Sequence, residues 1–111
     1  MSPFFLDKNM DIYYFNTQIK DELDGATSYI QRAIREKKEH PTWGALYLKM
    51  GLAELDHAAT LVKIFEDEYK ITTAKSSTPI PYLSDVRKSI LDMYTEFAAK
   101  IKYLQEMFEN M

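Results

Sequence analysis

The stretch Glu36-Lys37-Lys38-Glu39-His40-Pro41-Thr42-Trp43 decides the fold, because it joins two long helical patterns with hardly any linker between them. Basic side chains favour the carboxyl end of a helix, and a proline disfavours helical backbone at the residue before it. The first helix therefore ends near His40. Two helices joined by so short a link fold back on each other as an antiparallel hairpin.

Apolar residues recur at intervals of three and four on both sides of this link, as on one face of an amphipathic helix. We expect helices at about residues 8–39 and 42–69, with Thr42 as the N-cap of the second. Gly25, inside the first helix, suggests the close approach of another backbone. The stripes consist of Ile12, Phe15, Ile19, Leu23, Ala26, Ile30, Ala33 and Ile34, and of Trp43, Leu46, Tyr47, Met50, Ala53, Ala58, Leu61, Ile64 and Phe65.

A third helix follows a polar segment at residues 71–82, which is rich in Thr, Ser and Lys and contains Pro79 and Pro81. Such a composition is typical of a loop with an extended stretch. Ser84 is the expected N-cap of a helix at about 84–109. Its stripe consists of Val86, Ile90, Tyr94, Phe97, Ile101, Leu104 and Phe108. We expect an all-α fold, a helical hairpin plus a third long helix, in a single domain over residues 1–111.

The length of the chain favours association with a second copy. A domain of 111 residues buries only about two-thirds of the surface that its unfolded form exposes. Three helices of nearly 30 residues, each about 45 Å long, present more apolar face than one chain hides comfortably. Pairing two hairpins into a four-helix bundle would bury that face.

Charge and cysteine content exclude several classes of function. The chain has 14 Lys and Arg against 17 Asp and Glu, without a long basic block, so we expect no nucleic-acid partner. The absence of cysteine excludes disulfides and thiolate metal sites, and it is compatible with a reducing cytosol. No apolar run approaches 18 residues and no signal sequence is evident, so we expect a cytoplasmic protein without a membrane segment.

Glu54 and His57 stand inside the apolar stripe of the second helix. At about 100° per residue they lie within about 40° of the centre of the face shared with Met50 and Ile64. A carboxylate there is costly unless it is paired or bound to a cation. The Glu-x-x-His spacing puts both side chains on one side of neighbouring turns, whereas Asp56 points away.

Glu22 is the candidate third member of this group. It lies on the flank of the first helix's stripe, and an antiparallel hairpin brings it back opposite residues 54–57. Two simpler interpretations stay open at this point. Glu22 on its own is a common kind of flank carboxylate facing solvent, and Glu54 with His57 could form a buried ion pair without a metal.

These residues resemble a known family. The stretch Asp21-Glu22-Leu23-Asp24-Gly25-Ala26-Thr27-Ser28-Tyr29, followed by Ala53-Glu54-Leu55-Asp56-His57-Ala58-Ala59, is similar to the metal-binding hairpin of the ferritin-like superfamily. The similarity is greatest to encapsulated-ferritin and rubrerythrin-like members and covers about residues 12–69. It implies that Glu22, Glu54 and His57 are metal ligands, with Glu54 bridging. Asp21 and Asp24 match acidic positions that admit or hold extra metal ions in encapsulated ferritins.

The chain departs from a complete ferritin-like bundle, which has a second Glu and a second Glu-x-x-His. The third helix has no histidine, and its Glu96 is expected to face water. Two copies of Glu22, Glu54 and His57 would supply four carboxylates and two imidazoles across a two-fold axis. The resemblance thus implies a di-iron site at the interface of a homodimer or higher homo-oligomer, with two ions per dimer. Mn and Zn accept the same ligands.

The expected function is that of a ferroxidase, or of an iron-storage or oxidative-stress protein, which oxidises Fe(II) with oxygen or peroxide. The resemblance further implies an encapsulating shell protein as a partner, and so residence inside a protein nanocompartment. The third helix runs to the last residue without an obvious targeting tail. The alternative expectation is a non-catalytic helical interaction module in which Glu54 and His57 form a buried ion pair.

Overall fold

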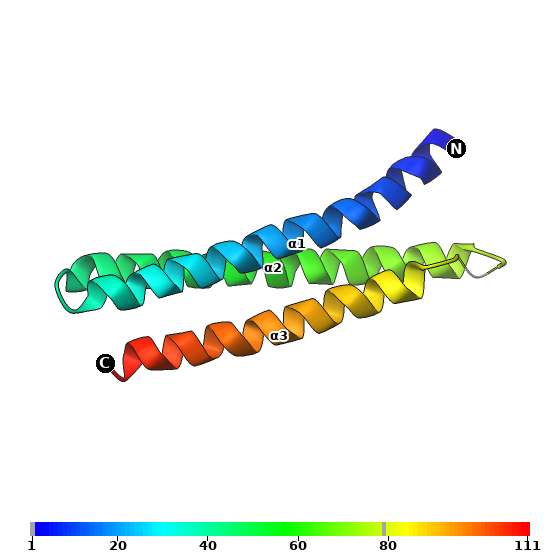
Figure 1. The fold of residues 1–111 in the computed structure, drawn as a ribbon. Helices are drawn as coiled ribbons and strands as arrows, with labels where there is room; N and C mark the ends of the chain where they lie inside the picture. The colour runs from blue at the N-terminus through cyan, green and yellow to red at the C-terminus, as the bar shows by residue number, and fades with distance from the viewer. Residues whose placement is uncertain (1, 79) are drawn as a thin grey trace.

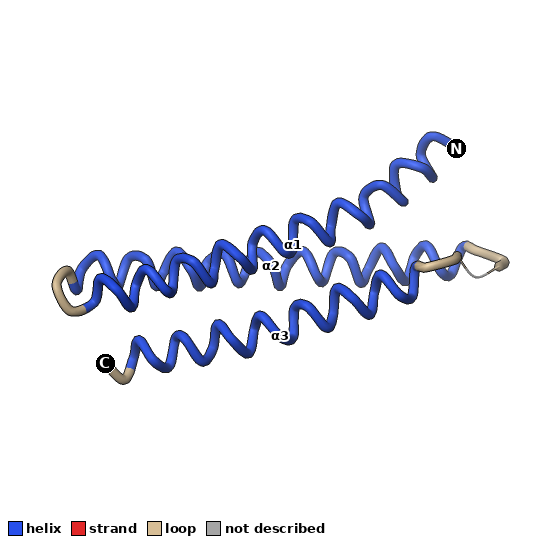
Figure 2. Tube along the Cα trace, viewed as in Figure 1, coloured by secondary structure: helices blue, strands red, loops and turns tan. Residues whose placement is uncertain are grey.

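Three long helices make up the fold of the computed structural model (Figure 1). The structure describes the backbone of residues 2–78 and 80–111 and the side chains of residues 14–78 and 80–111. The helices are α1 (Ser2–Lys37), α2 (Pro41–Lys75) and α3 (Leu83–Glu109), and they form a rod of 58 × 22 × 15 Å. The described residues contain no strand (Figure 2), which confirms the all-α class.

The helices are longer than the sequence predicts, by six residues both at the start of α1, which begins at Ser2, and at the end of α2. This helix continues to Lys75, six residues beyond the expected end at Tyr69. The Thr73 hydroxyl donates to the carbonyl oxygens of Tyr69 and Lys70, so this polar side chain is satisfied within the helix itself. Two further expectations, for the Ile12 side chain and for Pro79, lie outside the described residues.

Both predicted N-caps are wrong. Helix α2 begins one residue earlier, at Pro41, whose missing amide hydrogen costs nothing in the first turn of a helix. Helix α3 begins at Leu83, after Tyr82, which has a φ of 68° in the left-handed region. His40 and Tyr82, the two N-cap residues of the described helices α2 and α3, make no side-chain capping hydrogen bond.

Small residues on α2 allow it to approach α1 closely. The buried residues of α2 are Gly44, Gly51, Ala58 and Phe65, which recur every seven residues. A Cβ atom added to Gly51 would lie 2.6 Å from Ile30 Cγ1 and 3.0 Å from the Ala26 carbonyl oxygen. Gly44 approaches the α1 backbone just as closely near Lys37.

The sequence suggested that another backbone lies close to Gly25, and this expectation was wrong. The neighbour of Gly25 is the side chain of Glu54, whose Oε2 atom would lie 3.5 Å from an added Cβ atom. No α2 backbone atom is among its nearest neighbours. A Cβ atom at Gly25 would therefore make an ordinary van der Waals contact with a metal-ligand candidate.

Helix α3 packs along one side of the hairpin (Figure 1). Cationic side chains hold it near both ends. Near its start, the Arg87 guanidinium donates two hydrogen bonds to Glu66 of α2, at 2.9 and 3.0 Å. Near its end, the Lys37 ammonium donates to the Phe108 carbonyl oxygen and lies over the Phe108 ring. The buried core between the three helices consists of Ile19, Leu23, Ala26, Ile30, Ala33, Ala58, Phe65, Leu83, Ile90, Ile101 and Phe108.

A second apolar surface on α2 stays uncovered. Trp43, Leu46, Met50 and Ile64 were expected to share one buried face with Phe65, but their side chains are exposed by 44 to 55%. The buried line is the neighbouring one, from Gly44 to Phe65. Helix α2 thus has two apolar surfaces, one against α1 and α3 and one open. None of the described helices carries an apolar run long enough to cross a membrane.

Exchanging glycine for alanine at positions 51 and 25 should give opposite results. An alanine in a helix gains about 1 kcal/mol over glycine. At Gly51 this gain is outweighed by overpacking, which costs about 1–3 kcal/mol, because backbone of α1 blocks the new methyl group. We expect Gly51→Ala to lower the free energy of unfolding in a urea titration.

The matched variant Gly25→Ala, measured without metal, should leave the free energy of unfolding unchanged or raise it by up to about 1 kcal/mol, since its Cβ has room. Equal effects of the two variants would contradict the packing described for α1 and α2.

Candidate metal centre

The hairpin brings Glu22 of α1 together with Glu54 and His57 of α2. One ligand-type atom from each of the three residues lies within 4.8 Å of the other two. The Nδ1 atom of His57 lies 3.5 Å from the Oε2 atom of Glu22. Because α1 and α2 are antiparallel and Glu22 lies about as far before the turn as residues 54–57 lie after it, the fold itself produces this meeting.

The residues of this group differ in how far they are exposed to solvent. The side chain of Glu22 is 28% exposed and that of His57 is 61% exposed. The expectation of a buried Glu54–His57 ion pair is therefore wrong: His57 is open to solvent, and its nearest carboxylate oxygen belongs to Glu22. The Oε2 atom of Glu22 is buried and has no hydrogen-bond partner within the described residues. A buried, unsatisfied carboxylate oxygen is an acceptor for a proton or a cation.

Glu22 changes the ionisation of its neighbour Glu54. Glu22 raises the pKa of Glu54, first because a protonated Glu54 can share its hydrogen with Glu22. Partial burial of Glu54 and repulsion between the two negative charges raise its pKa further, and the nearby His57 lowers it. In the metal-free chain Glu54 is thus protonated more readily than an isolated glutamate.

The arrangement fits a metal ion after a small movement. Two ligand atoms that both bind one ion at about 2.1 Å are at most about 4.2 Å apart. Three such atoms spread evenly around the ion are about 3.6 Å apart, and the three atoms here lie within 4.8 Å of one another, so contraction by about 1 Å suffices. The exposed His57 ring has the freedom to make this movement, and Glu and His together suit iron, manganese and zinc.

The group opens away from α3. Glu66, which holds Arg87 of α3, follows His57 by nine residues on α2. At about 100° per residue, the side chains of Glu66 and His57 point to opposite sides of the helix. The metal-ligand candidates therefore face the same side of the hairpin as the uncovered apolar surface of α2.

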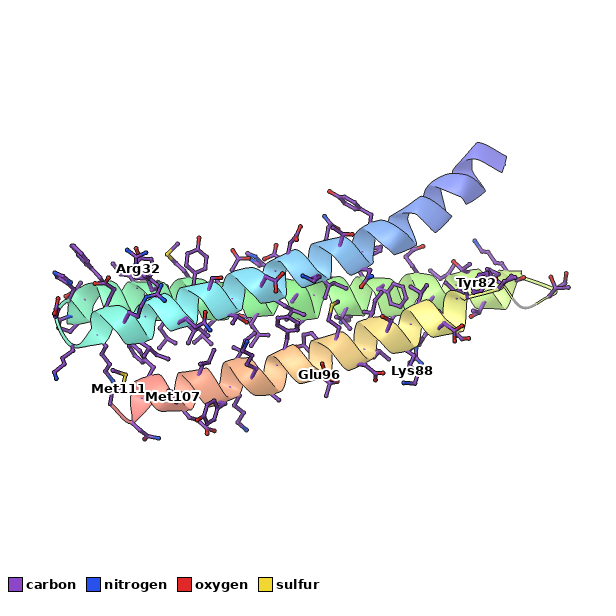
Figure 3. The ribbon with its side chains drawn as sticks, in the orientation of Figure 1. Arg32, Tyr82, Lys88, Glu96, Met107 and Met111 are labelled. Atoms are coloured by element: carbon purple, nitrogen blue, oxygen red, sulfur yellow. The ribbon has the colours of Figure 1, made fainter. Side chains whose placement is uncertain are left out.

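The other acidic candidates do not join the group. Asp24 pairs with Lys20 at 2.8 Å on the surface of α1, and Asp21 is exposed. Within the described side chains, neither belongs to a cluster of metal-ligand residues. Glu96 is exposed and points away from the other two helices (Figure 3), as expected from its position on α3.

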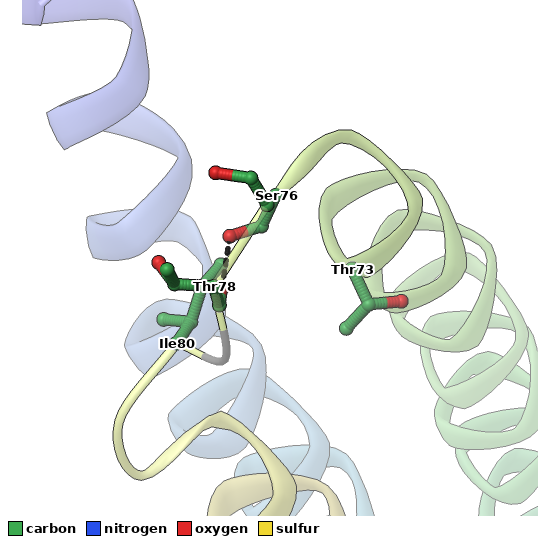
Figure 4. Close-up of a pocket in the computed structure, with 5 residues that line it drawn as sticks. Thr73, Ser76, Thr78 and Ile80 are labelled. Carbon is green, nitrogen blue, oxygen red and sulfur yellow. Dashed lines mark hydrogen bonds between the residues drawn. The ribbon is translucent and has the colours of Figure 1, made fainter.

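Two hollows lie outside the candidate site. One, of about 420 Å³, borders the uncovered surface of α2 and is lined by Trp43, Leu46, Tyr47 and Met50. The other, of about 270 Å³, lies at the α2–α3 connection among the hydroxyls of Thr73, Ser76, Ser77 and Thr78 together with Ile80 (Figure 4). In this second hollow the Ser76 hydroxyl donates to the Thr78 carbonyl oxygen, which stabilises the loop locally.

Comparison with known proteins adds no relative: no protein-family model, curated protein or solved structure matches the chain. The assignment of a function therefore depends on the side chains of the site and their surroundings.

The raised pKa of Glu54 predicts how the stability of the metal-free chain depends on pH. A group whose pKa is higher in the folded than in the unfolded chain contributes stability while it is protonated. This contribution is complete below the ordinary value of 4.5 and is lost as the pH rises through the raised value. We expect Glu54→Gln to lose this pH dependence, so that its melting temperature changes less above pH 4.5 than that of the parent.

The measurement is a series of thermal unfolding curves between pH 4 and 8 with a chelator present. Asp56→Asn is the matched control, because Asp56 lies in the same helix segment but is exposed and outside the carboxylate pair. Identical pH profiles for Glu54→Gln and the parent would contradict the raised pKa.

Proposed function

We propose that this chain is a ferritin-like iron protein that holds its metal between two copies and oxidises Fe(II) with oxygen or peroxide. The observation that supports this most is the meeting of Glu22, Glu54 and His57 around a buried carboxylate oxygen that lacks a hydrogen-bond partner in the described residues. The resemblance of the two sequence stretches to the ferritin-like hairpin supports the same proposal.

The donor set explains why a second copy is needed. One chain offers three ligands, two carboxylates and one imidazole. A ferritin-like di-iron site uses about four carboxylates and two histidines, which two copies of this group would supply. The group opens on the side of α2 where apolar side chains are uncovered, so a second copy placed there would bury that surface and complete the ligand set together.

Each residue has a role that follows from its chemistry. Glu22 and Glu54 are hard anionic ligands, which favour Fe(III) over Fe(II) and so favour the oxidised product. Because Glu22 raises the pKa of Glu54, a metal ion competes with protonation of Glu54 for the same carboxylate. His57, exposed at the edge of the group, supplies a neutral nitrogen ligand. Two Fe(II) ions release two electrons, which with two protons reduce oxygen to hydrogen peroxide, or hydrogen peroxide to water.

The proposal also includes the oligomeric state, the shell partner and the identity of the metal. Two ions per homodimer is the smallest assembly that the ligand set supports, and higher homo-oligomers built from such dimers are compatible with it. An encapsulating shell protein as a partner, and iron storage inside the shell, follow from the resemblance alone. Mn or Zn would occupy the same ligands without the oxidation step.

Iron binding is the direct test. Under anaerobic conditions we expect one Fe(II) per chain to bind, measured by calorimetry, and exposure to oxygen should then give the absorbance of Fe(III). Glu22→Gln and Glu54→Gln should each weaken binding about 100-fold or more, because each removes a charged ligand from a set of three. Asp56→Asn and Glu96→Gln, exposed carboxylates outside the group, should bind as the parent does. Absence of iron uptake by the parent chain would overturn the proposal.

The uncovered apolar surface also supports a second candidate, a helical interaction module without catalysis. The double variant Glu54→Leu/His57→Leu separates the two. If the polar pair is only structural, apolar replacement should leave the assembly as stable as before or more so. If the pair binds metal, the same variant should lose iron binding and any increase in assembly that iron causes, as measured by light scattering.

A further inference from the structure

The uncovered apolar surface of α2 follows a repeat of seven residues. Trp43, Met50, Ile64 and Ile71 are all exposed, by 42 to 53%, and His57 occupies the middle position of the same series. A straight helix of 3.6 residues per turn drifts by only about 20° per seven residues. These five side chains therefore form one nearly straight line along the helix, which we name the seam.

A repeat of seven is the pattern of a helix that packs lengthwise against another helix. Apolar residues every seven positions stay in register with a partner helix when the two wind gently around each other. The buried line from Gly44 to Phe65 has this spacing and packs on α1. The seam has the same spacing, and α3 lies on the opposite side of α2 from it, as the Glu66–Arg87 pair shows.

The seam is symmetric about His57. Met50 and Ile64 lie seven residues before and after it, and Trp43 and Ile71 lie fourteen residues before and after it. A two-fold axis at the level of His57, perpendicular to α2, would therefore place apolar residues of the seam against apolar residues of a copied seam. The metal ligands of the two copies would meet at the same level.

We propose that a second copy of this chain packs its α2 antiparallel on the seam. Met50 then contacts Ile64 of the partner subunit, and Trp43 contacts the partner subunit's Ile71. This inference rests on the proposed function for one point, that the metal group is shared between copies. It goes beyond the proposed function in fixing which helices meet and in which direction.

The polarity of α1 argues against the other two-fold arrangement, in which α2 would lie on α1 of the partner. On the side of α1 that borders the metal group stand Gly25, beside Glu54, and Arg32, whose guanidinium lies 5.2 Å from the centre of the Tyr47 ring. Arg32 also interacts with Glu36. Laying the seam of a second copy over α1 would bury this charge against apolar side chains.

The size of the seam predicts that metal strengthens the dimer. Residues 43 to 71 span about 42 Å, and a helix is about 10 Å wide, so the seam covers on the order of 400 Å² per copy. Stable interfaces bury about 1,200 Å² or more in total. The seam alone falls short of this area, and six ligands bound to two metal ions would add the missing free energy.

Disulfide trapping tests the direction of the helices, and the chain has no cysteine of its own to interfere. We expect Met50→Cys/Ile64→Cys, oxidised with diamide in the presence of Mn(II), to give a covalent dimer as the main species on a non-reducing gel. Each single variant should stay uncrosslinked, because identical positions would be about 21 Å apart along the dimer. Cysteines 50 and 64 of one chain are equally far apart, so a bond within one chain is excluded.

Lys49→Cys/Lys63→Cys is the matched control: it has the same spacing, one residue earlier, on exposed positions that turn away from the seam. This double variant should not crosslink. A covalent dimer from Met50→Cys alone, or from Met50→Cys mixed with Arg32→Cys, would overturn the antiparallel α2 pairing. So would a chain that light scattering finds monomeric with and without Mn(II).

The outcomes separate this inference from the proposed function. If the double variant crosslinks but the parent takes up no iron, the interface stands and the metal function fails. If the parent binds iron as a dimer but the double variant does not crosslink, the metal function stands and the direction of the helices is wrong.

Discussion

The close contact between α1 and α2 is the constraint on which the rest of the structure depends. It exists because Gly44 and Gly51 leave room for the α1 backbone, as shown by the 3.0 Å separation that a Cβ atom at Gly51 would have from the Ala26 carbonyl oxygen. With the two helices this close, short carboxylate side chains such as Glu22 and Glu54 can meet between them. Helices packed farther apart around larger side chains would leave the same residues separated by solvent. The meeting of Glu22, Glu54 and His57 is thus a consequence of small residues elsewhere on α2.

The third helix determines which side of the hairpin stays open. Arg87 and Lys37 join α3 to the hairpin near its two ends, and the apolar core fills the length between them. Because Glu66 and His57 point to opposite sides of α2, covering one side with α3 leaves the ligand side uncovered. The same arrangement leaves Glu96 on the outer side of α3, pointing away from α1 and α2 (Figure 3). Under the proposed function, the carboxylates that one chain lacks would therefore have to come from elsewhere than α3.

Sequence reasoning predicted the class, the hairpin and the meeting of Glu22, Glu54 and His57, because these follow from helical periodicity and a short turn. It failed on which apolar residues of α2 are buried. Hydrophobicity alone predicts that Trp43 and Met50 are buried and gives no reason to bury Gly44 and Gly51. Close packing of two helices instead requires the small residues at the helix contact. Treating the large residues as buried also placed His57 in the interior, where it is not. The sequence shows the seven-residue spacing of both lines, and this spacing distinguishes the line of small residues from the line of large ones.

The two apolar lines on α2 also explain why a polar group can stand among hydrophobic side chains without unfolding the helix. Glu54 lies between the buried line and the seam, partly covered by Gly25 and partly open, so the chain avoids the full cost of an ion in the core. Glu54 avoids this desolvation cost only while water covers the seam. Covering the seam with a second copy would remove water from four carboxylates at once, and like charges so close together need cations or protons between them. In the proposed dimer, assembly through the seam and binding of metal by Glu22, Glu54 and His57 would therefore be coupled, each stabilising the other.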